Sequence, residues 1–222
     1  MPAHNTHGSA LEALLGDTPV VPVVVVHDAA TAVPLAEALL AGGLRVIEIT
    51  LRTAAALAVI RTLVDNVPQA IIGAGSVLEP AQLVAAVRAG ARFTVSPGAS
   101  AALIDAASDS PVPWLPGAYT ASEVLQLRER GYRLLKFFPA EAGGGVEFLR
   151  ALHGPLPDVR FCPTGGIDAT RAARYLSLAN VACVGGSWLS LPSLLAEQNW
   201  NEVRHRAARA RGLRPSAATA AT

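Results

Sequence analysis

The segment YRLLKFFPAE, residues 132–141, holds Lys136, the only lysine among the 18 lysine and arginine residues of the chain. Two leucines precede this lysine and two phenylalanines follow it, so its ammonium group falls inside an apolar run. A short, continuous apolar run bounded by a proline is typical of a strand in a parallel sheet that helices cover on both faces. The segment therefore predicts a buried parallel strand. It places a charge where lysine is rarely found without a partner or a function.

Seven other segments share this design, because each is short, mostly apolar and bounded by glycine, proline or polar residues. The predicted strands, in chain order, are residues 20–26, 44–50, 70–76, 92–97, 113–118, 134–140, 160–166 and 181–187. Their starts recur about every 20 to 26 residues, a spacing that fits one strand plus one helix. The segments between them have the apolar periodicity of amphipathic helices, and glycines such as Gly90 and Gly131 mark their ends.

Eight such units predict an α/β protein with a closed (β/α)8 barrel, or TIM barrel, rather than an open doubly wound sheet. The segment GSALEALLGD, residues 8–17, predicts an extra N-terminal helix against the bottom of the barrel. No domain boundary or long linker is evident, so residues 1–222 are expected to form a single domain with a core at about 18–212. Residues 1–7 and 213–222 are expected to be disordered tails.

The composition excludes several classes of partner. A formal net charge of +1 provides no overall field that would attract nucleic acid or a membrane surface. The basic segment 203–214 is expected to be a solvated helix face. The N-terminal residues lack the cationic start and apolar core of a signal peptide, and no apolar run approaches the roughly 18 residues of a membrane span. We therefore expect a cytoplasmic protein that binds neither nucleic acid nor membranes.

Motifs for cofactors and metals are also missing from the sequence. GAGSVLEP lacks the third glycine of a dinucleotide fingerprint, and the single lysine does not belong to a Walker loop. Cys162 and Cys183 lie in apolar runs and lack the spacing of a zinc site, so we expect buried thiols. The sequence predicts no cofactor and no metal.

Lys136 lies in the sixth predicted strand, and the active sites of barrels lie at the C-terminal ends of the strands. Its charged end could reach solvent past an edge strand, but a closed barrel has no edge. The alternative is nucleophilic catalysis. An amine attacks a ketone only when it is neutral, and burial disfavours the charged form. Desolvated lysines form Schiff bases with carbonyl substrates, so we predict that Lys136 is such a nucleophile.

Glu48, within RVIEIT at 45–50, is the second charged residue in an apolar strand. It could form a salt bridge to Arg45 or Arg52. A carboxylate in an apolar wall is also suited to general acid/base catalysis, and forming and breaking a Schiff base both move protons. We therefore predict that Glu48 is the acid/base partner of Lys136. An ionised carboxylate nearby would at the same time favour the charged lysine.

Other residues at strand ends indicate how a substrate is held. Arg52 could grip a carboxylate through two hydrogen bonds, and the Ser76 hydroxyl could assist it. The pairs Gly165–Gly166 and Gly185–Gly186 follow the last two strands, where such barrels commonly bind phosphate through backbone N–H groups. Ordinary turns also contain glycine pairs. EAGGGVEF, residues 141–148, is either another binding loop or a flexible connection. These features predict a small-molecule substrate.

The assembled motifs resemble the 2-keto-3-deoxy-6-phosphogluconate (KDPG) aldolases, the class I aldolases of the Entner–Doudoroff pathway. The matching stretches run from about Thr18 to Leu189 and are PVVPVVVV, GGLRVIEITLRT, IIGAGSVLEPAQL, FTVSPG, LLKFFPAE, VRFCPTGGI and VGGSWL. EITLRT, KFFPAE and CPTGGI together are highly specific. The resemblance implies a homotrimer of barrels that uses no metal.

Position by position, the resemblance makes Lys136 the Schiff-base lysine and Glu48 the acid/base, with Arg52 and Ser76 on the substrate carboxylate. The other implied binding residues are Pro97 and Phe138 in the pocket wall, and Thr164, Gly165, Gly166, Gly186 and Ser187 at the hydroxyl and phosphate end. Ser76 stands where the family usually has threonine, so the hydroxyl is kept and a methyl group is lost. AEAGGG likewise replaces the common AEANGG.

The implied reaction is cleavage of KDPG to pyruvate and glyceraldehyde 3-phosphate, and in some relatives of 4-hydroxy-2-oxoglutarate to pyruvate and glyoxylate. Three alternatives stand beside it: an aldolase for the galactonate epimer, an isomerase or epimerase on a phosphate-binding barrel, and a barrel that binds a phosphorylated ligand without catalysis. The last two would not need a buried lysine nucleophile, so Lys136 favours an aldolase.

Overall fold

The computed structural model describes residues 6–213, and the parts of the predicted tails at 1–5 and 214–222 lie outside them. The strands are β1 (Val20–Val24), β2 (Val46–Thr50), β3 (Ile71–Gly75), β4 (Phe93–Val95), β5 (Trp114–Leu115), β6 (Gly117–Ala118), β7 (Leu134–Phe137), β8 (Arg160–Pro163) and β9 (Val184–Gly186). The helices are α1 (Thr6–Leu15), α2 (Ala32–Ala41), α3 (Ala56–Asn66), α4 (Pro80–Arg88), α5 (Ala101–Ser108), α6 (Ala121–Glu129), α7 (Gly145–His153), α8 (Ala169–Leu176), α9 (Pro192–Ala196) and α10 (Trp200–Arg211), with short 3-10 turns η1 (Ala29–Thr31) and η2 (Trp188–Ser190). None of the helices within residues 6–213 combines the length and hydropathy that a bilayer crossing requires.

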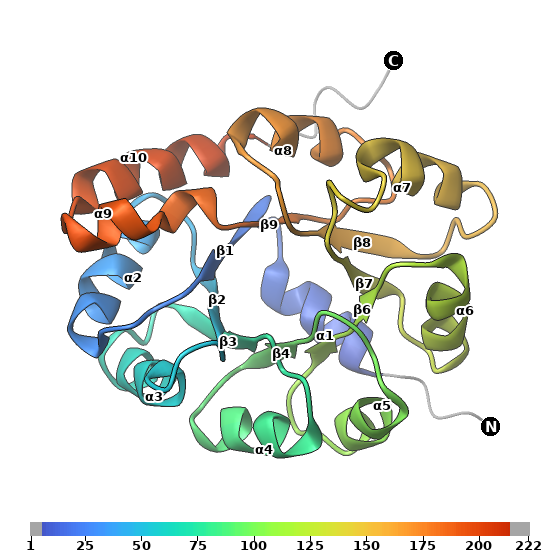
Figure 1. Ribbon diagram of the computed structural model, residues 1–222, viewed down its shortest axis with the longest axis horizontal. Helices are drawn as coiled ribbons and strands as arrows, with labels where there is room; N and C mark the ends of the chain where they lie inside the picture. The colour runs from blue at the N-terminus through green and yellow to red at the C-terminus, as the bar shows by residue number, and fades with distance from the viewer. Residues whose placement is uncertain (1–5, 214–222) are drawn as a thin grey trace.

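The strands pair in parallel and curl around a common centre, with helices outside them (Figure 1). One sheet has the order β5-β4-β3-β2-β1-β9, and the other has the order β6-β7-β8. Isolated parallel bridges from Phe161 to Val181 and from Thr164 to Gly185 join β8 to the chain around β9. The predicted α/β fold with a parallel sheet is confirmed.

The fifth predicted strand, 113–118, forms two short strands on either side of Pro116. Proline has no N–H group to donate to a sheet, so the ladder is interrupted there. β5 pairs with β4 and β6 pairs with β7, which is why the two sheets are separate. The Pro116 carbonyl still accepts a hydrogen bond of 2.8 Å from the backbone N–H of Lys136. The interruption therefore leaves β7 attached to the strand beside it.

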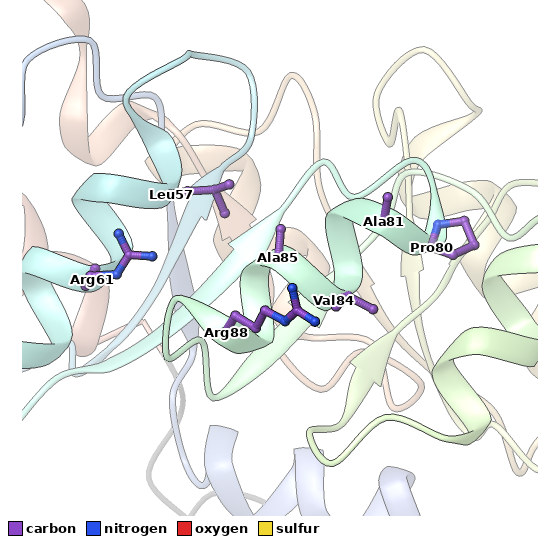
Figure 2. A pocket seen from close by; sticks show the side chains of 7 residues that line it. All are labelled: Leu57, Arg61, Pro80, Ala81, Val84, Ala85 and Arg88. Atoms are coloured by element: carbon purple, nitrogen blue, oxygen red, sulfur yellow. The ribbon is translucent and has the colours of Figure 1, made fainter.

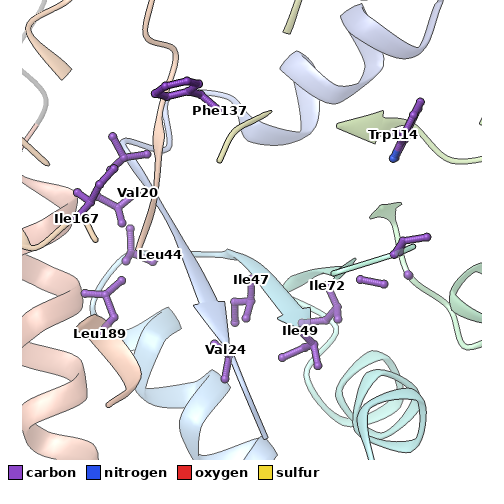
Figure 3. Packing of buried hydrophobic residues seen from close by; sticks show 14 of the residues in the cluster. Val20, Val24, Leu44, Ile47, Ile49, Ile72, Trp114, Phe137, Ile167 and Leu189 are labelled. Atoms are coloured by element: carbon purple, nitrogen blue, oxygen red, sulfur yellow. The ribbon is translucent and has the colours of Figure 1, made fainter. Parts of the chain in front are cut away.

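Successive residues of a strand face opposite sides of the sheet. In β2, Ile47 and Ile49 belong to the large core cluster between strands and helices (Figure 3), whereas Val46 belongs to a second cluster on the inner side. β7 alternates in the same way between the two clusters. Glu48 in β2 and Lys136 in β7 therefore both point inward.

Helix α1 covers one end of the space inside the strands (Figure 1). Its Leu11 and Leu15 are buried in the inner cluster. The strand residues of that cluster that lie at or next to the start of a strand are Val21, Val46, Ile71, Phe93 and Leu134. α1 therefore lies against the N-terminal ends of the strands, and the C-terminal ends remain available for a site. It begins at Thr6, slightly before the segment 8–17 in which the sequence predicts a helix.

We expect Leu11→Ala to lower the free energy of unfolding by about 3 kcal/mol, because it removes a fully buried side chain and leaves a cavity. The exposed fraction of Leu11 is 1%. Urea denaturation would measure the change. Leu125→Ala is the matched control, since the same substitution on an exposed helix face, at 44% exposure, should cost less than about 1 kcal/mol. Equal effects of the two substitutions would contradict the covering role of α1.

Candidate active site

Lys136 and Glu48 form an ion pair on the inner side of the curled strands. Lys136 Nζ lies 3.2 Å from Glu48 Oε1 and donates a hydrogen bond to it. The exposed fractions of the two residues are 5% and 3%. β7 and β2 belong to different sheets, so the pair crosses the enclosed space from wall to wall. The structure thus brings together the predicted nucleophile and the predicted acid/base, and Glu48 pairs with Lys136 rather than with Arg45 or Arg52.

Each charge makes the burial of the other tolerable. A single buried ammonium or carboxylate would lose several kcal/mol of solvation, and a partner at hydrogen-bond distance offsets that loss. The same contact is a path for a proton. Transfer from Nζ to Oε1 converts the ion pair into a neutral amine and a carboxylic acid, the forms needed for nucleophilic attack and for protonation of a leaving group.

The two glycines of β3 leave space for neighbouring side chains, Gly75 for Glu48 and Gly73 for Phe93. A Cβ atom at Gly75 would lie 2.0 Å from Glu48 Oε1, and one at Gly73 would lie 2.2 Å from the ring of Phe93. Any larger residue at Gly75 would push the carboxylate out of its position. A glycine inside a strand is itself a signal of close approach, but our interpretation of GAGS used only the Ser76 hydroxyl.

Phe138 lies close to Lys136, and Pro97 lies beside Gly117 on the neighbouring strand. The ring centroid of Phe138 is 5.7 Å from Nζ, so the ring face borders the amine. Gly117 pairs in register with Lys136, and a Cβ atom at Gly117 would lie 2.2 Å from the Pro97 carbonyl group. Both side chains are half-buried. The Phe138 ring thus borders the amine, and Pro97 lies beside the strand that pairs with the Lys136 strand.

Arg52 and Ser76 meet at the ends of β2 and β3. Arg52 Nε donates a hydrogen bond of 3.0 Å to Ser76 Oγ. Ser76 has a φ of 58°, a left-handed conformation that is uncommon outside glycine and is found at functional positions. Arg52 lines a cavity of about 670 Å³, and Ser187, which follows β9, lines the same cavity. Of the predicted site residues, Arg52 and Ser187 line this cavity.

The glycine pairs lie at the neighbouring ends of β8 and β9. Thr164 forms a bridge with Gly185, and a Cβ atom at Gly185 would lie 2.2 Å from Thr164 Oγ1. Gly165 and Gly166 have φ angles of 107° and 76°, a conformation that favours glycine. In the described part of the chain, the backbone N–H groups of Gly165 and Gly166 donate no hydrogen bond. They are therefore free to receive an anion.

The remaining predicted residues are placed as follows. Gly186 ends β9, and a Cβ atom there would lie 2.2 Å from the ring of Trp188. Ser187 follows it and is exposed. Cys162 and Cys183 are buried, as predicted. Within residues 6–213, no group of three or more His, Cys, Asp or Glu side chains is arranged to hold a metal ion.

A separate hollow of about 490 Å³ lies on the outer wall between α3 and α4 (Figure 2). Its lining residues are Leu57, Arg61, Pro80, Ala81, Val84, Ala85 and Arg88. The titratable side chains among them are two arginines, and the lining offers neither a carboxylate nor a nucleophile. The chemistry therefore belongs to the interior pair and not to this hollow.

Comparison with known proteins points in the same direction. Residues 11–206 match the family model described as KDPG and KHG aldolase. The 2-dehydro-3-deoxy-phosphogluconate aldolase of Pseudoalteromonas atlantica is 50% identical over 185 residues, 83% of this chain and 86% of the relative. The KHG/KDPG aldolase of Escherichia coli K12 is 50% identical over 181 residues, 82% and 85% of the two chains. A crystal structure of KDPG aldolase from Legionella pneumophila, with pyruvate captured as a covalent carbinolamine, is similar with a TM-score of 0.88 and 42% identity, covering 90% and 97% of the two chains.

The ion pair can be tested by a double-mutant cycle with Glu48→Gln and Lys136→Met. Each single substitution leaves a buried group without its charged partner and should cost about 3 kcal/mol of unfolding free energy. The double variant should cost less than the sum, by about 1 to 3 kcal/mol. Urea denaturation at neutral pH would measure all four proteins.

The exposed pair of Arg150 and Glu147, with side chains 59% and 73% exposed, provides the control cycle. We expect a coupling energy of at most about 0.5 kcal/mol there. A coupling between Lys136 and Glu48 as small as this surface value would contradict a structural dependence on the buried bond.

Proposed function

The chain belongs to the KDPG and KHG aldolase family, and we propose that it cleaves KDPG into pyruvate and glyceraldehyde 3-phosphate through a Schiff base on Lys136. The chain is thus an aldolase, a type of lyase. The observation that carries the assignment of roles is the buried 3.2 Å contact between Lys136 and Glu48, because Lys136 is the only lysine of the chain. Family membership sets aside the isomerase and the non-catalytic binder.

Schiff-base formation begins with a proton transfer. Glu48 takes a proton from Nζ, and the neutral amine of Lys136 attacks the C2 carbonyl of the substrate. Glu48 then moves a proton from the new C–N group to the C2 oxygen, which gives a carbinolamine. The carboxylic acid finally protonates the C2 hydroxyl, water leaves, and an iminium ion forms beside the restored carboxylate.

Carbon–carbon cleavage uses the same carboxylate. Glu48 removes the proton of the C4 hydroxyl, the C3–C4 bond breaks, and its electron pair moves into the iminium to give an enamine. Glyceraldehyde 3-phosphate leaves as the aldehyde product. The Glu48 acid protonates C3, and water adds to the pyruvyl iminium to release pyruvate and free Lys136. Phe138 and Pro97 would exclude bulk water from the amine during these steps.

The two ends of the substrate would be bound by different groups, side chains at the carboxylate and backbone N–H groups at the phosphate. Arg52 would bind the carboxylate next to C2 together with Ser76, a role supported by their 3.0 Å hydrogen bond. Thr164 would contact the substrate hydroxyls. The phosphate would lie at the glycine end, formed by Gly165 and Gly166 with Gly186 and Ser187. Unpaired backbone N–H groups favour this end for an anion.

Further properties belong to the same proposal. We infer a single domain in which the two sheets complete one (β/α)8 barrel closed at its base by α1, because only Pro116 separates β5 from β6 and two bridges link β8 to the β9 side. The resemblance adds a cytoplasmic homotrimer. Cleavage of 4-hydroxy-2-oxoglutarate is a second activity, supported by the Escherichia coli relative named KHG/KDPG aldolase.

Borohydride reduction in the presence of pyruvate should trap the imine as N6-(1-carboxyethyl)lysine at position 136. Peptide mass spectrometry would locate the adduct. The assay is clean because the only other primary amine of the chain is its N-terminus. Lys136→Met should give no internal adduct. Active wild-type protein without an adduct at Lys136 would rule out the Schiff-base role.

Gly75→Ala should lower kcat by at least about a hundredfold, because the new methyl group displaces the acid/base carboxylate of Glu48. Steady-state cleavage of KDPG would measure the loss. Gly154→Ala is the control, since a Cβ atom there would meet nothing within 4 Å, and its φ of −58° suits alanine. If Gly75→Ala were folded and fully active, Glu48 could not be the acid/base.

A further inference from the structure

The turn of Thr164, Gly165 and Gly166 is anchored by all three of its carbonyl groups. The backbone N–H of Ala140 donates to the Thr164 carbonyl at 2.8 Å, and that of Glu141 donates to the Gly165 carbonyl at 3.1 Å. Arg171 Nη1 donates to the Gly166 carbonyl at 3.0 Å. The three donors come from the loop after β7 and from α8, so the turn is fixed from one side.

This anchoring determines where the N–H groups of the turn point. In a trans peptide the N–H group points opposite to the carbonyl group of the same unit, and the units after Thr164, Gly165 and Gly166 are trans. The N–H groups of Gly165, Gly166 and Ile167 therefore face away from the anchors. Among residues 6–213 they find no acceptor. Three successive N–H groups without an acceptor, in a turn that the positive φ angles of Gly165 and Gly166 allow, offer donors to an anion.

Glu141 connects the anchors to one another. Its Oε1 accepts a hydrogen bond of 2.5 Å from the hydroxyl of Tyr175, and its Oε2 lies 3.2 Å from Arg171 Nε. A Cβ atom at Gly166 would lie 2.8 Å from Glu141 Cβ, so this side chain packs directly against the turn. Tyr175 is fully buried and belongs to α8. The carboxylate thus ties the loop after the Lys136 strand to the helix that follows the glycine turn.

The network also removes an electrostatic conflict. A free carboxylate beside a phosphate would repel it. Both oxygens of Glu141 already have partners, since Oε1 accepts a hydrogen bond from Tyr175 and Oε2 forms an ion pair with the Arg171 guanidinium. Burial and the Glu141 carboxylate raise the pKa of the Tyr175 hydroxyl, so it remains a donor throughout the neutral pH range.

We propose that Glu141, Tyr175 and Arg171 form a positioning network that holds the N–H groups of Gly165, Gly166 and Ile167 toward the substrate phosphate. The inference rests on the proposed function and extends it to residues that do not touch the substrate. The network joins the Lys136 strand to the phosphate-binding turn, so it sets the distance between the reacting carbon and the anchored end.

Tyr175→Phe and Glu141→Gln test the network without removing a turn residue. We expect each to raise KM for KDPG about fivefold to tenfold, the effect of losing about 1 kcal/mol of positioning. The pyruvate concentration that half-saturates borohydride trapping at Lys136 should stay within about twofold of the wild-type value, because pyruvate has no phosphate. Glu147→Gln makes the same change from carboxylate to amide as Glu141→Gln, but in an exposed ion pair of α7. It should alter neither KM for KDPG nor the pyruvate concentration that half-saturates trapping.

Arg171→Gln changes an exposed side chain and keeps the buried residues intact. It should also raise KM for KDPG while leaving the pyruvate dependence of trapping unchanged. An unchanged KM for KDPG in all three variants would overturn the inference, and so would an equal loss in both readouts, which indicates general damage to the fold. Wild-type protein that does not cleave KDPG would instead overturn the proposed function.

Discussion

The hydrogen bond between Lys136 and Glu48 constrains much of the surrounding structure. Two strands from different sheets must face each other across an enclosed space, and both side chains must occur at inward positions of their strands. The neighbouring strand must then avoid the same volume, which is why β3 carries Gly75 where a methyl group would overlap the carboxylate. Apolar burial supplies most of the stability, but it does not require a glycine at position 75. The charged pair does.

Much of the architecture could be predicted because its signal is local. Each strand is a short apolar run between glycine, proline or polar residues, and all eight predicted segments contain a strand. Lys136 and Glu48 were recognisable as charges in such runs. Their partnership was predicted from the chemistry of a Schiff base, while local sequence also left Arg45 and Arg52 as salt-bridge partners of Glu48. The direct contact with Lys136, 88 residues away, comes from the fold. Strand periodicity tells which side chains point inward, but it does not tell which of them meet across the interior.

At the glycine turn, too, some features can be predicted from the local sequence, whereas others depend on residues far away in the chain. Positive φ angles at Gly165 and Gly166 are a property that a glycine pair predicts by itself. Glu141 and Tyr175, which help to orient the turn, are 34 positions apart in the sequence. In the sequence, Tyr175 cannot be told from an ordinary core residue of a helix. The role of its hydroxyl as a hydrogen-bond donor can be recognised only once the fold has placed Glu141 beside it. Pro116 is the converse case: residues 113–118 were predicted as a single strand, although a proline inside an apolar run is itself a local indication of an interrupted ladder.

The division of chemistry between the two ends explains why one lysine is sufficient. A phosphate could be held by lysine side chains, but another primary amine near a keto acid would be a second site for imine formation. Backbone N–H groups and a guanidinium bind anions without offering a nucleophile. In the proposed reaction, the single amine becomes neutral by passing a proton to the Glu48 carboxylate that it contacts. Under the proposed function, the contact that offsets the cost of burying both charges would also carry the first proton transfer, and the glycine turn would bind the anion without offering a second amine.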